Sequence, residues 1–175
     1  DVLKNPKAMV LLNGAMKDMV DTVSTQKIAR GNMKYVGVIP ENVITKLDNL
    51  DKAPQSAVIA VRDDDVLHAL RDSKQAKGIS LPVEFWEQLP EKLRHPKAIL
   101  LQAKEQQRNK NAGDALLFVY ETEKGKVAVK MDYEVKIKDE LSGKKLAHKL
   151  NIVRTASVVE DFTQLGAFEV LYGSL

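Results

Sequence analysis

The chain has 175 residues, of which 44% are hydrophobic and 29% are charged, and its formal net charge is +3. This composition is typical of a folded domain with an ordinary core and excludes a disordered chain, and no apolar run approaches the roughly 18 residues that a membrane-spanning helix needs. The absence of Cys excludes disulfides, thiol catalysis and thiolate metal sites, and three His far apart in the sequence argue against a His-based metal site.

Residues 1–33 are predicted to form a helical extension ahead of an α+β domain that spans residues 34–175. Asn5 and Pro6 suit the start of a helix. Apolar side chains then recur at helical spacing, at Met9, Leu12, Met16, Met19, Val20 and Val23. An amphipathic helix is therefore predicted over residues 5–24, and its Met residues are interpreted as core filler.

Short elements are predicted in the middle of the chain. Residues 35–39 are predicted to form a strand that a proline stops, followed by a helical turn that ends at residue 47. Residues 57–61 are a short apolar run, which indicates a buried strand. Three aspartates then favour a helix start, because negative charge there interacts well with the helix dipole, and this helix is predicted over residues 63–74. A second helical stretch covers residues 82–94 and is interrupted near its second proline.

The C-terminal part has the two-residue period of β-strands. Strands are predicted over residues 98–103, 114–122, 126–138 and 149–159. The third is the clearest, because six apolar residues alternate with polar ones from Val127 to Ile137. The fold class that these patterns predict is α+β, with helices packed on a four-stranded antiparallel meander sheet and an N-terminal helical extension. Residues 162–175 fit either a strand or a helix.

Positive charge is concentrated between residues 124 and 154. This segment contains nine Lys or Arg against four acidic residues, and so carries a net charge of +5. A local excess of this kind suits an anionic partner, and phosphate is the commonest one. The alternative is a lysine-rich, solvated strand face that keeps the sheet soluble.

His68 and Arg71 form the first candidate site. Residues three apart on a helix share a face, so the helix predicted over residues 63–74 brings the imidazole and the guanidinium together. An imidazole can transfer a proton near neutral pH, and the planar fork of a guanidinium can hold a phosphate. The pair is therefore a minimal set for phosphodiester chemistry. The alternative is that His68 is a partly exposed helix residue paired with Asp64 or Asp72.

The last predicted strand carries the second candidate site. Regular alternation places Asn151, Thr155 and Ser157 on one side of this strand and Arg154 on the other. Hydroxyl groups in a row beside a basic strand can bind phosphate oxygens. Lys130, on the solvated side of the neighbouring strand, is expected opposite either Thr155 or Ser157. The alternative is that these Thr and Ser residues are ordinary exposed strand residues.

The sequence contains no phosphate-binding loop, dinucleotide fingerprint or other local catalytic motif, so any activity must come from groups that folding brings together. The order of the elements nevertheless resembles a known family. It runs from the strand at 57–61 through the helix with His68 and Arg71, Ile79-Ser80-Leu81-Pro82 and Leu89-Pro90 to Pro96, and ends in the meander. Over about residues 34–160, this order is similar to the phage-associated nuclease-like domains of the barnase/EndoU/colicin/RelE superfamily. Those domains occur at the C-termini of phage head proteins related to the Mu F protein and in polymorphic toxins.

The resemblance implies a metal-independent endoribonuclease that needs no cofactor and often acts as a toxin. In that chemistry a base takes the proton of the ribose 2′-hydroxyl, which attacks the adjacent phosphorus and expels the next nucleotide. The resemblance implies that His68 is the acid/base and Arg71 a phosphate clamp. Thr155 or Ser157, with Lys130, would hold the pentacoordinate phosphate. Where the family has a second His shortly after the Arg, this chain has Asp-Ser-Lys, which leaves retention of the activity open.

The partners that the resemblance implies are RNA, with tRNA among the candidate targets, and an immunity protein or a phage head protein. No membrane partner is predicted, and the implied location is the cytoplasm or a phage virion. The rival hypothesis is a non-catalytic structural or protein-interaction module of a phage head protein, and a pure nucleic-acid-binding module lies between the two. The chain begins with Asp1 rather than Met and shows no signal-peptide pattern, which fits a fragment of a longer protein.

Overall fold

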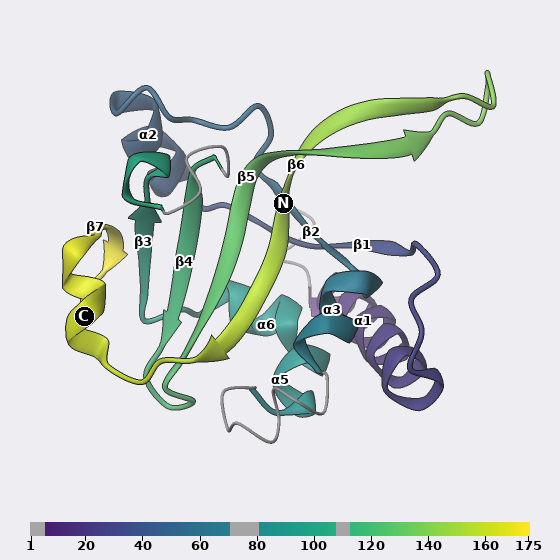
Figure 1. Cartoon of the computed structure of the whole chain (residues 1–175), viewed down its shortest axis with the longest axis horizontal. Coiled ribbons are helices and arrows are strands. Elements are labelled where there is room, and N and C mark those ends of the chain that lie inside the picture. Colours follow the sequence, from purple (N-terminus) through teal and green to yellow (C-terminus); the bar gives the residue numbers. More distant parts are fainter. Residues whose placement is uncertain (1–5, 71–80, 108–112) are drawn as a thin grey trace.

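One mixed β-sheet organises the structure. The computed structural model describes residues 6–70, 81–107 and 113–175, and in this part of the chain seven strands lie side by side in the order β1-β2-β6-β5-β4-β3-β7 (Figure 1). The strands are β1 (Met33–Val38), β2 (Val58–Arg62), β3 (Ala98–Gln102), β4 (Ala115–Tyr120), β5 (Gly125–Lys138), β6 (Lys145–Val158) and β7 (Glu169–Gly173). β2 is parallel to β6, and every other neighbouring pair is antiparallel.

The predicted four-stranded antiparallel meander is wrong. β3, β4, β5 and β6 do lie next to one another, but β1, β2 and β7 extend the sheet at both edges. β2 suits an inner position because both of its sides are apolar, with Ile59 and Val61 in one buried cluster and Ala60 in another. β7 forms from the tail whose conformation the sequence leaves open, and it pairs with β3.

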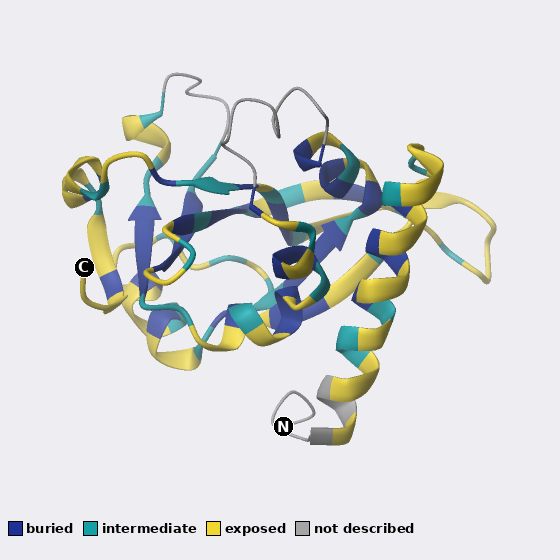
Figure 2. Cartoon of the chain, turned by 90° about the horizontal axis from the view of Figure 1, so that it is seen from below, coloured by how far each residue is buried: buried dark blue, intermediate teal, exposed yellow. Residues whose placement is uncertain are grey.

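Helices pack on one side of the sheet, called the helix face. The helices of the described residues are α1 (Pro6–Gln26), α2 (Glu41–Asn49), α3 (Asp63–Ala69), α5 (Val83–Glu87) and α6 (Leu89–Arg94), with short 3₁₀ turns η2 (Lys104–Gln106) and η3 (Phe162–Ala167). Each α-helix contributes to the main core, through side chains such as Met16, Val43, Val66, Trp86 and Leu89. This core faces the buried sides of the strands, which Figure 2 shows in dark blue. The part of the predicted helix that follows residue 70 lies outside the described residues.

The other side of the sheet, called the open face, has two unlike halves. Over β3 and β4 it is covered by η3 and the segment around it, where Leu165 and Phe168 pack on Leu100 and Leu117. Over β1, β2 and β6 the buried cluster around Ala60 contains side chains of strands alone. Within the described residues, no helix contributes a side chain to this second cluster.

Two parts of the chain extend beyond the sheet and the core. The β5–β6 hairpin continues past the other strands as an arm over residues 133–150 (Figure 1), and the N-terminal half of α1 projects from the body (Figure 2). Leu141 at the tip of the arm is 98% exposed, and Val10 and Leu11 on α1 are 71% and 75% exposed. Although α1 has 21 residues, no helix within the described ranges is long and apolar enough to cross a membrane.

A bulge marks the root of the arm. Met131 and Asp132 of β5 together oppose Asn151 of β6, and Asp132 has a φ of 52°, which Asp tolerates better than most residues. The buried Asn151 amide donates to the carbonyls of Ser56 at 2.6 Å and Val58 at 2.9 Å, and its Oδ1 accepts from the Asp132 N–H at 3.3 Å. Asn151 therefore joins the start of β2 to β5 and serves the fold, rather than facing a ligand beside Thr155.

Candidate functional site

Tyr133, at the root of the arm on the open face, has two guanidinium groups over its ring. The Cζ atoms of Arg62 and Arg154 lie 5.0 Å and 4.9 Å from the ring centroid. The Nη1 of Arg154 also donates a hydrogen bond of 2.8 Å to the Tyr133 hydroxyl. The parallel pairing of Val61 with Val153 places the two arginines at adjacent positions of β2 and β6. The sheet topology thus brings two like charges together, and the aromatic ring attracts both.

Asp65, in the first turn of α3, pairs with both arginines. Its Oδ2 lies 2.9 Å from Nε of Arg62, and its Oδ1 lies 3.7 Å from Nε of Arg154. Burial lowers the pKa of the Arg62 guanidinium, but the hydrogen bond and the negative charge of Asp65 outweigh that effect and raise it. Asp65 is only 6% exposed, so this carboxylate is fixed between the sheet and α3.

Lys130 adds a third cation to this region of the open face. Its half-buried ammonium donates a hydrogen bond to Oε1 of Gln107. Burial lowers the pKa of Lys130, the positive charge of Arg154 lowers it further, and the negative charge of Asp114 acts in the opposite direction. An anion bound between Lys130 and Arg154 would relieve their repulsion, which is a property of anion-binding sites.

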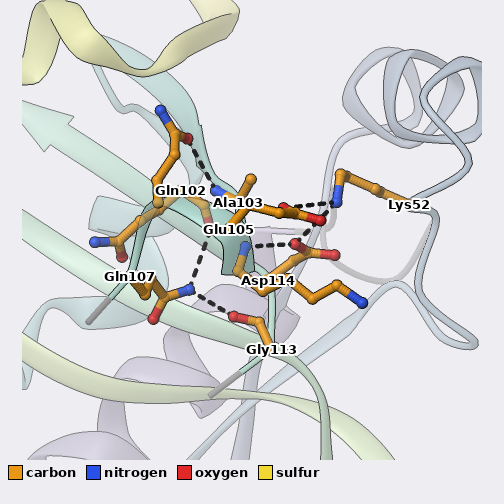
Figure 3. A network of polar contacts seen from close by, with 9 residues as sticks. Lys52, Gln102, Ala103, Glu105, Gln107, Gly113 and Asp114 are labelled. Carbon is orange, nitrogen blue, oxygen red and sulfur yellow. Dashed lines mark hydrogen bonds and ion pairs between the residues drawn. The ribbon is translucent and has the colours of Figure 1, made fainter. Parts of the chain in front are cut away.

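A polar network positions the side chain of Gln107. Its Nε2 donates to the carbonyls of Gln102 at 3.3 Å and Gly113 at 2.5 Å (Figure 3). Its Oε1 is therefore oriented to accept from Lys130. Beside it, Asp114 pairs with Lys52 at 3.2 Å. Because Asp114 also pairs with Lys52, its negative charge only partly balances the positive charge of Lys130.

These five residues are together called the cationic cluster: Arg62, Asp65, Lys130, Tyr133 and Arg154. The cluster contains three cations and one carboxylate, so it carries an excess of two positive charges. A metal cation is a poor ligand for it, because its one carboxylate already pairs with two arginines. Elsewhere within residues 6–70, 81–107 and 113–175, no three His, Asp or Glu side chains are arranged to hold a metal ion.

Thr155 and Ser157 lie on the open face beside the cationic cluster, but neither lies opposite Lys130. In the observed register Ser157 pairs with Lys126, and Lys130 pairs with Ile152. Both positions expected for Lys130 are therefore wrong. The β5–β6 hairpin sets a register that places Thr155 and Ser157 further along the sheet, and the bulges shift the partner of Lys130 by one residue more. Thr155 is exposed and Ser157 is half-buried, so both hydroxyl groups remain within reach of a ligand on this face.

A bulge in β6 determines the direction of Arg154. The register with β5 shifts between Val153 and Thr155, which leaves Arg154 as an extra residue in β6. Its guanidinium contacts Tyr133, whose ring packs in the apolar cluster of the open face. Arg154 and Thr155 therefore face the same side. The prediction that they face opposite sides is wrong, because it assumed an unbroken alternation.

His68 is exposed on α3, one turn after Asp65. Because residues three apart share a helix face, His68 lies on the side of α3 that Asp65 directs toward the cationic cluster. Arg71 lies outside the described residues. The pairing of His68 with Arg71 therefore stays a prediction.

Three members of the cationic cluster are absent from the predicted site: Arg62, Asp65 and Tyr133. Alternation counts Tyr133 only as one of the apolar residues of its strand. Asp65 belongs to the aspartate run that predicts a helix start. A local signal for Arg62 and Asp65 was available in the sequence. Arg62 directly follows a buried strand and directly precedes three aspartates, which indicates a charged group at the end of that strand.

Comparisons with known proteins give no relative: no family model matches the chain, and no curated protein or solved structure is significantly similar to it. The resemblance to phage-associated nuclease-like domains therefore stays a hypothesis. The candidate site depends on the geometry of its residues.

Proposed function

We propose that the chain binds the phosphate groups of RNA at the cationic cluster and cleaves the RNA as a metal-independent endoribonuclease. The observation that carries the binding half is the gathering of Arg62, Lys130 and Arg154 on the open face, with one carboxylate between the two arginines. The cleavage half depends on the family resemblance and on the position of His68 one helical turn after Asp65 on α3.

The arginines of the cluster suit phosphate for a geometric reason. A guanidinium presents five N–H donors in a planar fork that matches two phosphate oxygens, and the contacts of Arg62 and Arg154 described above use a minority of these donors. A phosphate at this position would also add negative charge next to Lys130 and raise its pKa. RNA binding at these cations releases counterions from the phosphates, and this release is less favourable at high salt. Binding should therefore weaken as salt concentration increases.

The proposed cleavage step transfers the phosphoryl group within the RNA. The His68 imidazole takes the proton of a ribose 2′-hydroxyl, and the 2′-oxygen forms a bond to the adjacent phosphorus. The bond from phosphorus to the 5′-oxygen of the next nucleotide breaks, and this oxygen gains a proton from water. The cluster cations and the hydroxyl groups of Thr155 and Ser157 stabilise the extra negative charge on the phosphorus oxygens. The products are a 2′,3′-cyclic phosphate and a 5′-hydroxyl end.

Incubation of RNA with the purified protein and an excess of chelator tests the cleavage. We expect fragments that end in a 2′,3′-cyclic phosphate, and we expect His68→Ala to remove this activity without changing the thermal unfolding midpoint. His95→Ala is the matched control, because His95 is exposed and pairs with Glu91 at 3.1 Å on another helix. Intact RNA in the wild-type reaction, with binding retained, would reduce the function to RNA binding.

A non-catalytic protein-interaction module is the second candidate function. The strongly exposed Val10 and Leu11 on the projecting helix, and Leu141 at the tip of the arm, favour it. Apolar side chains at the extremities of a molecule are suited to contacts with another protein. A complete lack of RNA binding at low salt would support this function over the first.

A further inference from the structure

An apolar pocket lies at the β1 edge of the sheet, near the cationic cluster, where side chains of the open face meet Leu12 of α1. It has a volume of about 350 Å³ and is lined by Leu12, Tyr35, Gly37, Val38, Val58 and Leu150, which belong to α1, β1, β2 and β6. Small-molecule sites have volumes of roughly 300–1,000 Å³, so this pocket is at the lower end of the range. Tyr35 is 54% exposed, and its ring is therefore accessible at the pocket wall.

The register of the sheet places this pocket next to the arginines. Leu150, in the pocket wall, lies directly opposite Tyr133, which carries both guanidinium groups. Tyr35 lies opposite Ala60, and Arg62 is two residues further along the same side of β2. Diagonal neighbours of this kind are roughly 7–8 Å apart, within reach of long side chains. One nucleotide could therefore touch both the pocket and the cluster.

We infer that the pocket is a nucleobase subsite for single-stranded RNA. An unstacked base packs against Tyr35 and the aliphatic wall, while a phosphate of the same strand contacts Arg62 and Arg154. This inference rests on the proposed RNA binding and adds a selection for unpaired nucleotides. Bases within a duplex are stacked on both sides, so only loops, ends and single strands can place a base in the pocket.

The charge around the pocket favours a nucleotide over an apolar peptide. The pocket lining contains no charged side chain, whereas the neighbouring cluster has an excess of positive charge. A ligand with a flat apolar part and an attached anionic group complements both surfaces at once. An aromatic wall accepts the π-face of every base, so we expect weak sequence preference. β1 is an edge strand, so the pocket lies at the border of the sheet.

Fluorescence anisotropy with Tyr35 variants tests the subsite. The probe is a fluorescein-labelled single-stranded RNA of about 12 nucleotides with every 2′-hydroxyl methylated, which prevents cleavage. We expect Tyr35→Ala and Tyr35→Leu each to weaken binding roughly tenfold and Tyr35→Phe to retain it. Tyr35→Leu keeps apolar cover over the strands, so it reports on the aromatic ring if Tyr35→Ala fails to fold. Binding of inorganic polyphosphate, which has negative charge but no bases, should be the same for all four proteins.

Three outcomes would overturn the subsite, and they differ from failure of the proposed function. RNA affinity that is the same for Tyr35→Leu and wild type would remove the subsite and leave phosphate binding intact. An equal loss of affinity for RNA and polyphosphate would assign Tyr35 to the phosphate site instead. If a Tyr35 variant binds RNA as the wild type does but sediments differently, the pocket is a surface for self-association instead. If neither RNA nor polyphosphate binds to the wild-type protein, the proposed RNA binding itself is wrong.

Discussion

The guanidinium of Arg154 contacts Tyr133 in two ways, through a hydrogen bond of 2.8 Å to the hydroxyl and a position 4.9 Å from the ring centroid. Tyr133 lies just after the bulge in β5, and Arg154 is the extra residue of the bulge in β6. Two irregularities in neighbouring strands are thus needed to bring these side chains together. The contact joins the root of the arm to the part of the sheet where the cationic cluster lies.

Tyr133→Phe should reduce stability slightly, because it removes the hydrogen bond to Arg154 and retains the ring. The expected loss in the free energy of unfolding is about 1 kcal/mol, measured by urea denaturation. Tyr133→Leu should be less stable again, since it also removes two cation–π contacts that each contribute about 0.5–1 kcal/mol. If both variants are as stable as the wild type, the aromatic ring does not hold the arginines together.

Asp65→Asn should change stability and RNA affinity in opposite directions. The substitution removes the one negative charge among three cations, so the free energy of unfolding should fall by about 2 kcal/mol. The larger excess of positive charge should increase RNA affinity at low salt. Asp64→Asn is the matched control, because Asp64 is the exposed neighbour in the same helical turn. A loss of RNA affinity in Asp65→Asn would show that the carboxylate acts by orienting the arginines.

Acid should destabilise the fold in part through Glu123. The hydrogen bond from Lys92 lowers the pKa of this carboxyl below its ordinary value of 4.5, and burial acts in the opposite direction. A lowered pKa in the folded state stabilises the fold above the pKa of the unfolded state, and this contribution is lost as pH falls through the folded value. The free energy of unfolding should therefore fall between about pH 5 and pH 3, and Glu123→Gln should reduce this slope. An unchanged slope in the variant would assign the acid sensitivity to other carboxylates.

Local periodicity predicted many of the elements but not their arrangement. The alternation from Val127 to Ile137 predicted β5, and helical spacing predicted most of α1, because both signals arise from neighbours in sequence. The place of β2 depends on its pairing with β6, which lies about 90 residues further along the chain. No local pattern specifies such a pairing, so the sheet was predicted with too few strands.

The candidate site shows the same limit at the level of single residues. Alternation placed Lys130 on the solvated side of its strand, and Thr155 and Ser157 on one side of theirs, as the structure has them. The direction of Arg154 could not be predicted, because a bulge depends on how two strands pair and not on the sequence of one strand alone. Alternation counted Tyr133 only as one of the apolar residues of its strand, although its hydroxyl and its ring both contact arginine side chains.

RNA binding as a function of salt concentration is the most direct test of the central claim, that the cationic cluster holds RNA phosphates. We predict that the 2′-O-methylated RNA binds to the wild-type protein with an affinity that falls steeply with salt. Arg154→Gln should weaken binding about tenfold at low salt and reduce the slope of log affinity against log salt by about 1. Lys17→Ala, an exposed position on α1, should behave as the wild type. The same affinity and slope for Arg154→Gln and wild type, or no binding at low salt, would contradict the account.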